Sequence, residues 1–268
     1  MVKKDFVVCN QSKLCYTVYG SGSDKMLAFH GFGQSGEVFS EFEKACPEYT
    51  IYAFDLFYFG ESKWEEDMDV LEPGFWKTWM ERFLDKENID KFSIVGFSLG
   101  AKLALLTFEL YYTLTERILL IAPDGIKPSL LYRMATQYVV PKAYFRYIIR
   151  HPNTFFRLLY ILGSLRLIDK GTGYFVVRQM DSLRKRRKAY DAWMLYRNIW
   201  PSNPTIADLI NRSMIPVIFI LGEKDRVIDG KKIVPLMSRL SRAEVVELPC
   251  SHHKLLEKTA YWLAADNG

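Results

Sequence analysis

A serine between two glycines stands where an apolar run gives way to a helix-forming run, in the sequence Gly96-Phe97-Ser98-Leu99-Gly100. The apolar residues 92–97 are typical of a buried strand, and the alanines and leucines that follow favour a helix. This is G-x-S-x-G between a strand and a helix, the context that the motif requires. Gly96 and Gly100 carry no Cβ, so a strained turn can lift the Ser98 hydroxyl clear of the sheet. The free N–H groups of the helix that begins there would stabilise an anion beside Ser98.

Short apolar runs alternate with helical patterns over most of the remaining chain. The alternation predicts an α/β fold, with a mostly parallel eight-stranded sheet covered by helices on both faces. The first two runs, separated by four polar residues, predict an antiparallel hairpin. The predicted strands are residues 6–9, 14–19, 26–30, 50–54, 92–97, 117–122, 215–221 and 244–248; the predicted helices are 37–45, 75–86, 98–112, 184–200, 230–240 and 253–265.

Residues 126–204 interrupt this alternation, because their pattern is helical and rich in aromatic residues. We interpret them as a helical cap inserted after the sixth strand, with residues 1–125 and 205–268 forming the core domain. Residues 127–200 contain 15 Lys or Arg and three Asp, so they carry 12 net positive charges, whereas the rest of the chain carries seven net negative charges. This asymmetry predicts two substructures with different surfaces.

Five residues that can carry chemistry stand at the ends of predicted strands or in the loops that follow them. They are His30, Ser98, Asp124, Asp225 and His252. In parallel sheets, ligands bind outside the carboxyl ends of the strands, so we expect these side chains to converge on one crevice. A serine hydroxyl needs a base, and an imidazole backed by a carboxylate supplies one near neutral pH.

The composition argues against several other classes of protein. Apolar residues make up 49% of the 268 residues, yet no run approaches the roughly 18 apolar residues of a membrane span. The first residues do not form a secretory signal, and the four cysteines show no metal-ligand spacing, so we expect a cytoplasmic protein. We expect no nucleic-acid partner, because no recognised binding fold is visible and the body of the chain is acidic.

The chain resembles a capped, serine-nucleophile member of the α/β-hydrolase superfamily over essentially its whole length. The order of serine, aspartate and histidine agrees with that family. The resemblance implies a Ser-His-Asp triad acting through an acyl-enzyme, with no metal and no organic cofactor. The matching pieces are His30-Gly31-Phe32-Gly33, Asp55-Leu56, Phe59-Gly60-Glu61-Ser62, the serine motif, Gly222-Glu223-Lys224-Asp225, and His252 with Glu257.

The resemblance places the base at His252 rather than at the adjacent His253. In the family the catalytic histidine often precedes a glutamate by five positions, and the spacing from His252 to Glu257 fits. A glycine commonly precedes that histidine, whereas this chain has Ser251, so a shift by one position stays open.

For the acid, the resemblance favours Asp225, which follows the penultimate strand. Some relatives use an acid after the strand that follows the serine motif, and Asp124 occupies that position. Asp124 has a second interpretation as the cap of the first helix of the insertion.

The oxyanion hole implied by the resemblance consists of the backbone N–H groups of Phe32 and Leu99. His30 and Gly31 support the loop that carries Phe32, with His30 orienting it through hydrogen bonds. Asp55 is interpreted as part of the loop structure as well.

Two further residues near the predicted site receive structural interpretations. Lys102, two positions after the serine motif, is interpreted as a helix residue whose stem lies along the surface with its charge in water. Cys250, two positions before His252, is interpreted as core packing.

These observations predict a serine hydrolase of carboxylic esters or thioesters. A small acyl substrate that is amphiphilic or anionic would suit a cap with fourteen aromatic residues and a cationic rim. The basic cap can alternatively contact an acidic membrane surface, or merely keep the cap solvated. Carbon–carbon bond hydrolysis or elimination on the same fold, and a non-catalytic ligand receptor, remain alternative functions. Ser98 argues against the relatives with an aspartate nucleophile.

Overall fold

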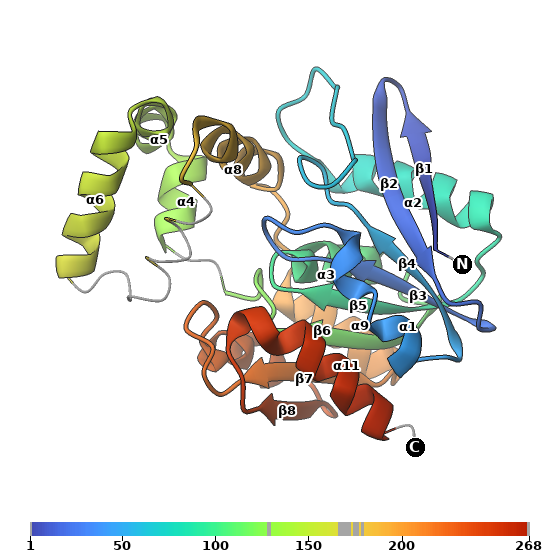
Figure 1. Ribbon diagram of the computed structural model, residues 1–268. Coiled ribbons are helices and arrows are strands. Elements are labelled where there is room, and N and C mark those ends of the chain that lie inside the picture. Colours follow the sequence, from blue (N-terminus) through green and yellow to red (C-terminus); the bar gives the residue numbers. More distant parts are fainter. Residues whose placement is uncertain (1, 128–129, 166–172, 174–176, 178–179, 267–268) are drawn as a thin grey trace. The chain divides into compact units, whose positions relative to one another are not determined.

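The protein is described here by a computed structural model that covers residues 2–127, 130–165, 173, 177 and 180–266. The chain forms two compact units, which we call the sheet unit and the helical unit (Figure 1). The sheet unit comprises Met1–Asp67, Glu72–Lys127 and Ile199–Gly268, and the helical unit comprises Met68–Leu71 and Pro128–Asn198.

The sheet unit contains a single eight-stranded sheet of order β1-β2-β4-β3-β5-β6-β7-β8. The first two strands form the predicted antiparallel hairpin, β2 is also antiparallel to β4, and all other neighbours are parallel. The central strand β5 is buried along its whole length, as its run of apolar and small residues predicts. The strands are β1 (Lys3–Cys9), β2 (Ser12–Tyr19), β3 (Asp24–Phe29), β4 (Tyr49–Phe54), β5 (Phe92–Phe97), β6 (Thr115–Ile121), β7 (Val217–Gly222) and β8 (Glu244–Leu248).

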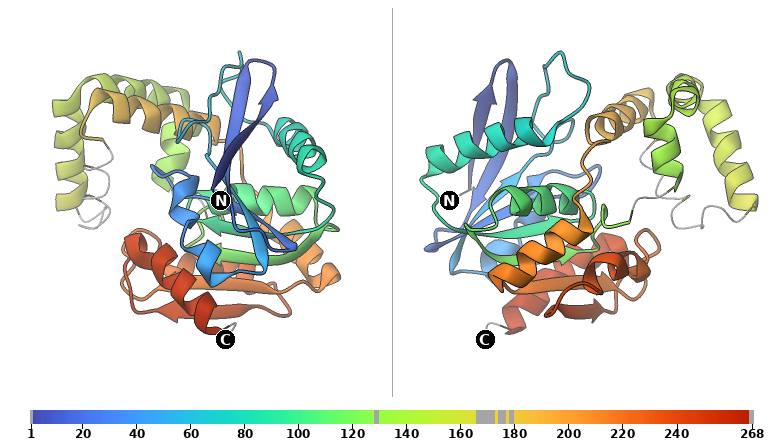
Figure 2. Two further views of the ribbon diagram at one scale, coloured as in Figure 1. Left: turned by 45° about the vertical axis from the view of Figure 1, so that its right-hand side comes forward. Right: turned by 180° about the vertical axis from the view of Figure 1, so that it is seen from behind.

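Helices cover both faces of this sheet (Figure 2). On one face α1 (Phe42–Ala45) contacts α11 (Leu255–Asp266), and their apolar side chains join those of the strands in one buried cluster. On the other face α3 (Gly100–Leu110) packs between α2 (Pro73–Glu87) and α9 (Asn203–Ser213). The predicted α/β fold, with an eight-stranded sheet between two layers of helices, is confirmed.

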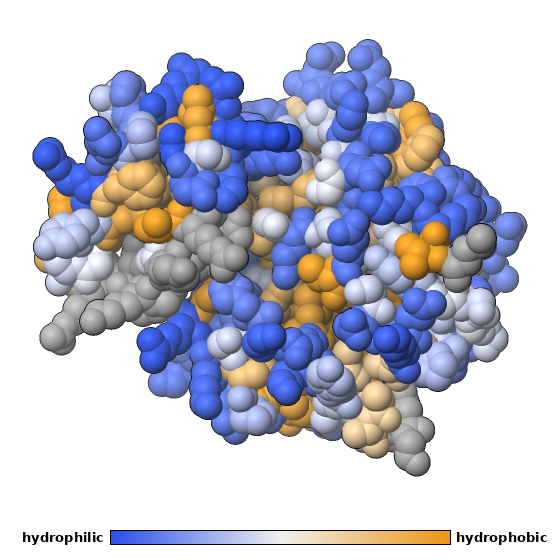
Figure 3. All heavy atoms as spheres, in the orientation of Figure 1, coloured by the Kyte–Doolittle hydropathy of each residue, from blue (hydrophilic) through white to orange (hydrophobic). Residues whose placement is uncertain are grey.

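The helical unit is built from amphipathic helices between β6 and β7 in sequence. On the face seen in Figure 3 its described surface mixes hydrophilic and hydrophobic patches. In the basic run 184–188 four side chains are exposed, but Arg186 is buried. Its described helices are α4 (Leu130–Gln137), α5 (Val139–Arg150), α6 (Pro152–Ser164) and α8 (Leu183–Leu195).

The Arg186 guanidinium group is held inside the helical unit by backbone acceptors. Its Nε donates to the carbonyl oxygen of Ile149, and its Nη1 donates to that of Met180, each at 2.9 Å. A buried guanidinium group needs such partners. Arg186 is therefore a structural residue of this unit and not part of its solvated charge.

The single helix predicted over residues 37–45 is wrong. The chain forms a 3₁₀ helix, η1 (Gly36–Phe39), followed by the one-turn helix α1. The buried side chains Phe39 and Phe42 lie three positions apart, a spacing that a 3₁₀ helix and an α-helix share, so the apolar pattern does not distinguish the two.

The helix predicted over residues 230–240 is likewise divided, into η2 (Gly230–Ile233) and α10 (Val234–Met237). Pro235, which has no N–H to donate, stands in the first turn of α10. Helix α9 was not predicted, although Pro204 near its start and the apolar residues that follow are typical helix signals.

Candidate active site

The turn between β5 and α3 has the backbone conformation that the serine motif predicts. Ser98 has φ of 50°, in the left-handed region of backbone conformation that residues with a Cβ rarely adopt. A Cβ on Gly96 would lie 2.6 Å from the Ala104 Cβ, and a Cβ on Gly100 would lie 2.1 Å from the Phe29 carbonyl oxygen. The two glycines therefore allow α3 and β3 to approach the turn closely.

Backbone hydrogen bonds hold Ser98 between two strands. Its N–H donates to the carbonyl oxygen of Ile121, at the end of β6, over 2.9 Å. Its own carbonyl oxygen accepts from the N–H groups of Ala101 and Asp124, each at 3.0 Å. Because three neighbours fix the backbone, the conformation of this strained residue is determined by its surroundings.

The loop after β7 carries Asp225 with its carboxylate oriented by the backbone. Oδ1 accepts hydrogen bonds from the N–H groups of Val227 at 2.7 Å and Ile228 at 2.9 Å. Oδ2 is left to face His252 and lies 2.6 Å from the imidazole Nδ1. The carboxylate side chain is 1% exposed, so this contact is shielded from water.

His252 reaches Asp225 because the loops after β7 and β8 are joined. Lys224 N–H donates to the Cys250 carbonyl oxygen at 3.1 Å, and a Cβ on Gly222 would lie 2.7 Å from that oxygen. His252 begins the 3₁₀ turn η3 (His252–Lys254) and is buried. The predicted histidine and aspartate are thus brought into contact.

The imidazole of His252 also packs beside the serine turn. Its ring centroid lies 4.9 Å from that of Phe97, the residue before Ser98. Among the described residues no hydrogen bond joins Ser98 Oγ to His252; the two are linked through the Phe97 ring.

Two residues near His252 in sequence, His253 and Glu257, lie toward the surface. His253 is exposed. Glu257, whose spacing favoured His252, pairs with Lys254 at 2.8 Å on the surface of η3 and α11. The contact with Asp225, and not any contact with Glu257, distinguishes His252 from its neighbour.

Phe32 and Leu99 lie on the loop after β3 and at the start of α3. Within the described part of the chain, neither of their backbone N–H groups donates a hydrogen bond to the protein. Gly31 packs close to the serine turn, since a Cβ there would lie 3.0 Å from the Phe97 ring. These two loops therefore approach each other beside Ser98, where the sequence predicts an oxyanion hole.

His30 is fully buried, and backbone groups occupy both of its ring nitrogens. Nε2 accepts from the Leu56 N–H at 3.0 Å, so Nδ1 carries the proton and donates to the Gly31 carbonyl oxygen at 2.6 Å. Burial lowers the pKa of His30 to about 4, against smaller opposing effects of the Gly31 carbonyl and of Asp55. His30 is a neutral imidazole that ties two loops together.

Asp55 is a loop residue, as its sequence context indicated. Its Oδ1 accepts from the Gly36 N–H at 2.8 Å and its Oδ2 from the Glu61 N–H at 2.7 Å. Cys250 is buried in the cluster beneath α11, and burial raises the pKa of its thiol.

The interpretation of Lys102 is wrong. Its side chain is 1% exposed, so its charge is not held in water. Its Nζ lies 3.8 Å from Asp124 Oδ2, whereas His252 lies against Asp225. The sequence gives no signal for this burial, because a lysine two positions after the motif looks like any solvated helix residue.

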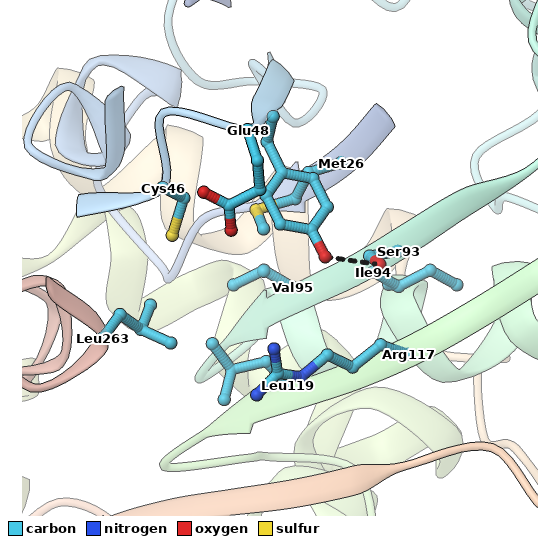
Figure 4. A pocket seen from close by; sticks show the side chains of 10 residues that line it. Met26, Cys46, Glu48, Ser93, Ile94, Val95, Arg117, Leu119 and Leu263 are labelled. Carbon is cyan, nitrogen blue, oxygen red and sulfur yellow. Dashed lines mark hydrogen bonds between the residues drawn. The ribbon is translucent and has the colours of Figure 1, made fainter. Parts of the chain in front are cut away.

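A pocket lies at the opposite edge of the sheet, near the amino ends of β3, β5 and β6 (Figure 4). The Tyr49 hydroxyl and the Ser93 hydroxyl are 3.4 Å apart in its wall. It contains none of the predicted site residues. It is lined by Met26, Cys46, Glu48, Tyr49, Ser93, Ile94, Val95, Arg117, Leu119 and Leu263.

Two features bear on other kinds of site. Within the described residues, no group of three or more His, Cys, Asp or Glu side chains is arranged to hold a metal ion. No helix in this part of the chain combines the length and the apolar character needed to cross a membrane.

The sequence matches a model of the Alpha/beta hydrolase family over residues 26–265. The abhydrolase domain-containing protein abhd-5.2 of Caenorhabditis elegans is 24% identical over 248 residues, which cover 82% of this chain and 52% of that protein. The chain thus spans about half the length of this curated relative.

Solved structures show the same architecture. MGS-M2, an alpha/beta hydrolase enzyme from a Medee basin deep-sea metagenome library, superimposes with a TM-score of 0.70 at 16% identity, covering 97% of this chain and 95% of that one. A thermophilic esterase from Thermogutta terrifontis gives a TM-score of 0.69 at 15% identity, covering 99% and 97% of the two chains. At these identities the similarity concerns the fold.

Proposed function

Because the chain belongs to the alpha/beta hydrolase family, we propose that it is a serine hydrolase that cleaves carboxylic esters or thioesters. The proposal depends above all on one observation. The imidazole of His252 lies 2.6 Å from the oriented Asp225 carboxylate and packs on the residue that precedes Ser98. Nucleophile, base and orienting acid are the three roles that this chemistry requires.

In the proposed reaction Ser98 Oγ attacks the acyl carbonyl carbon and His252 Nε2 takes the hydroxyl proton. The Asp225 carboxylate holds Nδ1–H and stabilises the imidazolium. The N–H groups of Phe32 and Leu99 donate to the oxyanion of the tetrahedral intermediate. His252 then gives the proton to the leaving alcohol or thiol, and the Ser98 acyl-enzyme remains.

Water completes the cycle. His252 takes one proton from a water molecule, whose oxygen bonds to the acyl carbon while the bond to Ser98 Oγ breaks. The proton on His252 returns to Ser98 Oγ, and a carboxylic acid leaves. Each step uses groups of this chain and water, so the proposed reaction needs no metal or organic cofactor.

The charge of the helical unit supports an anionic or amphiphilic acyl substrate. Residues 127–200 carry 12 net positive charges, and they expose Arg184, Lys185, Arg187 and Lys188 in one run. A positive field raises the local concentration of anionic substrates. On this ground we also propose that residues 126–204 act as the cap that the sequence predicts.

The cytoplasmic setting is also part of the proposal. All four cysteines belong to the described residues, and each is a buried free thiol: Cys9, Cys15, Cys46 and Cys250. Disulfides are rare in reducing compartments, so free thiols fit that setting. Fractionation of cells that express the tagged chain tests it.

Substitution Ser98→Ala tests the proposed nucleophile. Hydrolysis of a short-chain aryl ester should fall by roughly 10⁴- to 10⁶-fold, the range for loss of a triad nucleophile. A phosphonate probe should label Ser98 in the parent. Ser93→Ala is the matched control, because Ser93 is a buried serine of β5, the strand that leads to Ser98, and lies at the other edge of the sheet.

The same experiment separates the rival functions. Labelling at another residue with Ser98 untouched would contradict the proposed nucleophile. Labelling of Ser98 without turnover of esters or thioesters would favour carbon–carbon cleavage or elimination. Ligand-dependent stabilisation with neither labelling nor turnover would favour a receptor.

A further inference from the structure

Lys102 lies in the first turn of α3, four residues after Ser98, with its charge inside the sheet unit. Its Nζ is 3.8 Å from Asp124 Oδ2 and 3.8 Å from the centroid of the Trp200 ring. Buried charges are retained where other groups balance them, and an aromatic face attracts an ammonium group most strongly when water is excluded. Lys102 thus contacts two loops, the one after β6 that carries Asp124 and the one before α9 that carries Trp200.

Asp124 connects Lys102 to the serine turn. Its backbone N–H donates to the Ser98 carbonyl oxygen at 3.0 Å. Ser98 and Ala122, at the ends of the adjacent strands β5 and β6, both have left-handed backbones, with φ of 50° and 40°. Such conformations persist only when the surroundings hold them. A group that fixes Asp124 therefore also restrains Ser98.

Lys102 also contacts the two segments of the sheet unit that border the helical insertion in sequence. Gly125 in the leaving segment has φ of 100°, and a Cβ there would lie 2.5 Å from Lys102 Cγ. Trp200 lies in the returning segment. Asn203 Nδ2 donates to the Ile126 carbonyl oxygen at 2.8 Å, which ties the two segments together.

We propose that Lys102 is a positioning residue that, by holding Asp124 and Trp200, fixes the backbone of the Ser98 turn and the two segments that border the insertion. This inference rests on the proposed function, since Ser98 is the nucleophile that is positioned. Asp124 is 31% exposed and can reach solvent, whereas Lys102 cannot. Burial lowers the pKa of Lys102 and the Asp124 carboxylate raises it, so the carboxylate helps keep the lysine charged.

Substitution Lys102→Met removes the charge and keeps an unbranched stem. With enzyme concentration taken from phosphonate titration of Ser98, kcat should fall about 10- to 100-fold, since small misplacements of a reacting group cost this much. KM should stay within about twofold. Glu109→Gln is the matched control, because it changes one charge on the same helix, seven positions from Lys102, and should leave kcat unchanged.

The partner variant shows whether the effect passes through the carboxylate. Asp124→Asn should lower kcat about tenfold. The double variant should be no worse than Lys102→Met alone, because both changes break the same contact between Lys102 and Asp124. If Lys102→Met does not fold, Asp124→Asn alone decides. A lower melting temperature with unchanged kcat per titrated Ser98 would overturn the proposal.

Hydrogen exchange supplies a readout that does not need turnover. Amides of residues 121–127 should exchange faster in Lys102→Met than in the parent or in Glu109→Gln. Unchanged exchange in this segment would refute the positioning role of Lys102, even if the enzyme is active. Absence of Ser98 labelling in the parent would instead refute the proposed function, so the two failures are distinguishable.

Discussion

Two buried histidines follow strands of the same sheet, and their partners make them different. His30 lies between a carbonyl oxygen and a backbone N–H, while His252 faces a carboxylate oxygen. Both side chains are shielded from water. Because both rings are buried, the groups that touch each imidazole are what distinguish the two.

The consequence for His30 is that both ring nitrogens are occupied. A proton on Nε2 would break the hydrogen bond from Leu56 and place a buried charge beside an N–H group. For His252 the contact with Asp225 engages Nδ1, and the proposed reaction uses Nε2 to take the Ser98 proton. The comparison assigns a structural role to one ring and supports the proposed catalytic role of the other.

The largest effect that the comparison predicts is on turnover. His252→Ala should reduce kcat by roughly 10⁵- to 10⁶-fold, as expected for loss of a triad base. His253→Ala is the matched control, because the neighbouring ring is exposed; it should change kcat by less than about threefold. A large loss in His253→Ala with an active His252→Ala would move the base by one position.

The next effect concerns the carboxylate. Asp225→Asn keeps the shape of the side chain but removes the charge beside Nδ1, and kcat should fall by about 10⁴-fold. Asp124→Asn changes the aspartate that lies near Lys102 instead, and its loss should be about tenfold. Steady-state kinetics of both variants decide between the two acids; the opposite ranking would assign the role to Asp124.

His30 predicts a smaller effect, on stability. Its pKa is about 4 in the folded protein against an ordinary value of 6.5, so the unfolded chain binds the proton first as the pH falls. Stability from this residue is complete above pH 6.5 and declines toward pH 4, by on the order of 2 kcal/mol between pH 6.5 and 5.

Urea unfolding of the parent and of His30→Asn at pH 7 and pH 5 measures this contribution. The asparagine amide can still donate toward the Gly31 carbonyl oxygen but does not titrate. The variant should be less stable at pH 7 and should lose less stability at pH 5. His151→Asn, at an exposed histidine, should behave as the parent does. Equal pH dependence in all three proteins would contradict the assignment.

The architecture was predictable because it depends on local patterns. Buried strands such as 92–97 are continuous apolar runs, and the glycines of the serine motif mark a turn that only a few sequences allow. The broken helices at 37–45 and 230–240 were not predicted, because the spacing of apolar residues is similar in a 3₁₀ helix and an α-helix. Pro235, in the first turn of α10, is the local signal for the second break.

The contacts of the site were harder to predict than its residues. Asp225 and His252 stand 27 positions apart, and only backbone bonds between the loops after β7 and β8 bring them together. The Phe97 ring packs beside His252, but the motif allows any residue type at this position and so does not predict the contact. Lys102 was misinterpreted, because burial of a lysine depends on loops that are distant in sequence.

The smallest predicted effect comes from charges at a distance. The two histidines differ through the groups that touch them. We therefore expect the distant charges of the helical unit to change kcat/KM only by attracting the substrate. We expect an ester with a remote carboxylate to lose kcat/KM at high salt, because screening acts over ~8 Å at physiological ionic strength. A neutral ester should barely respond.

The variant for this test changes Arg184, Lys185, Arg187 and Lys188 to glutamine and keeps Arg186, whose guanidinium group is bound to backbone carbonyls inside the unit. The anionic ester should lose several-fold in kcat/KM, which is less than the 10- to 10³-fold effect of strong electrostatic steering, and its salt dependence should flatten. The neutral ester serves as the internal control. Equal responses of both esters would mean that the exposed charges only solvate the helices, and contact groups alone would then set the specificity of the site.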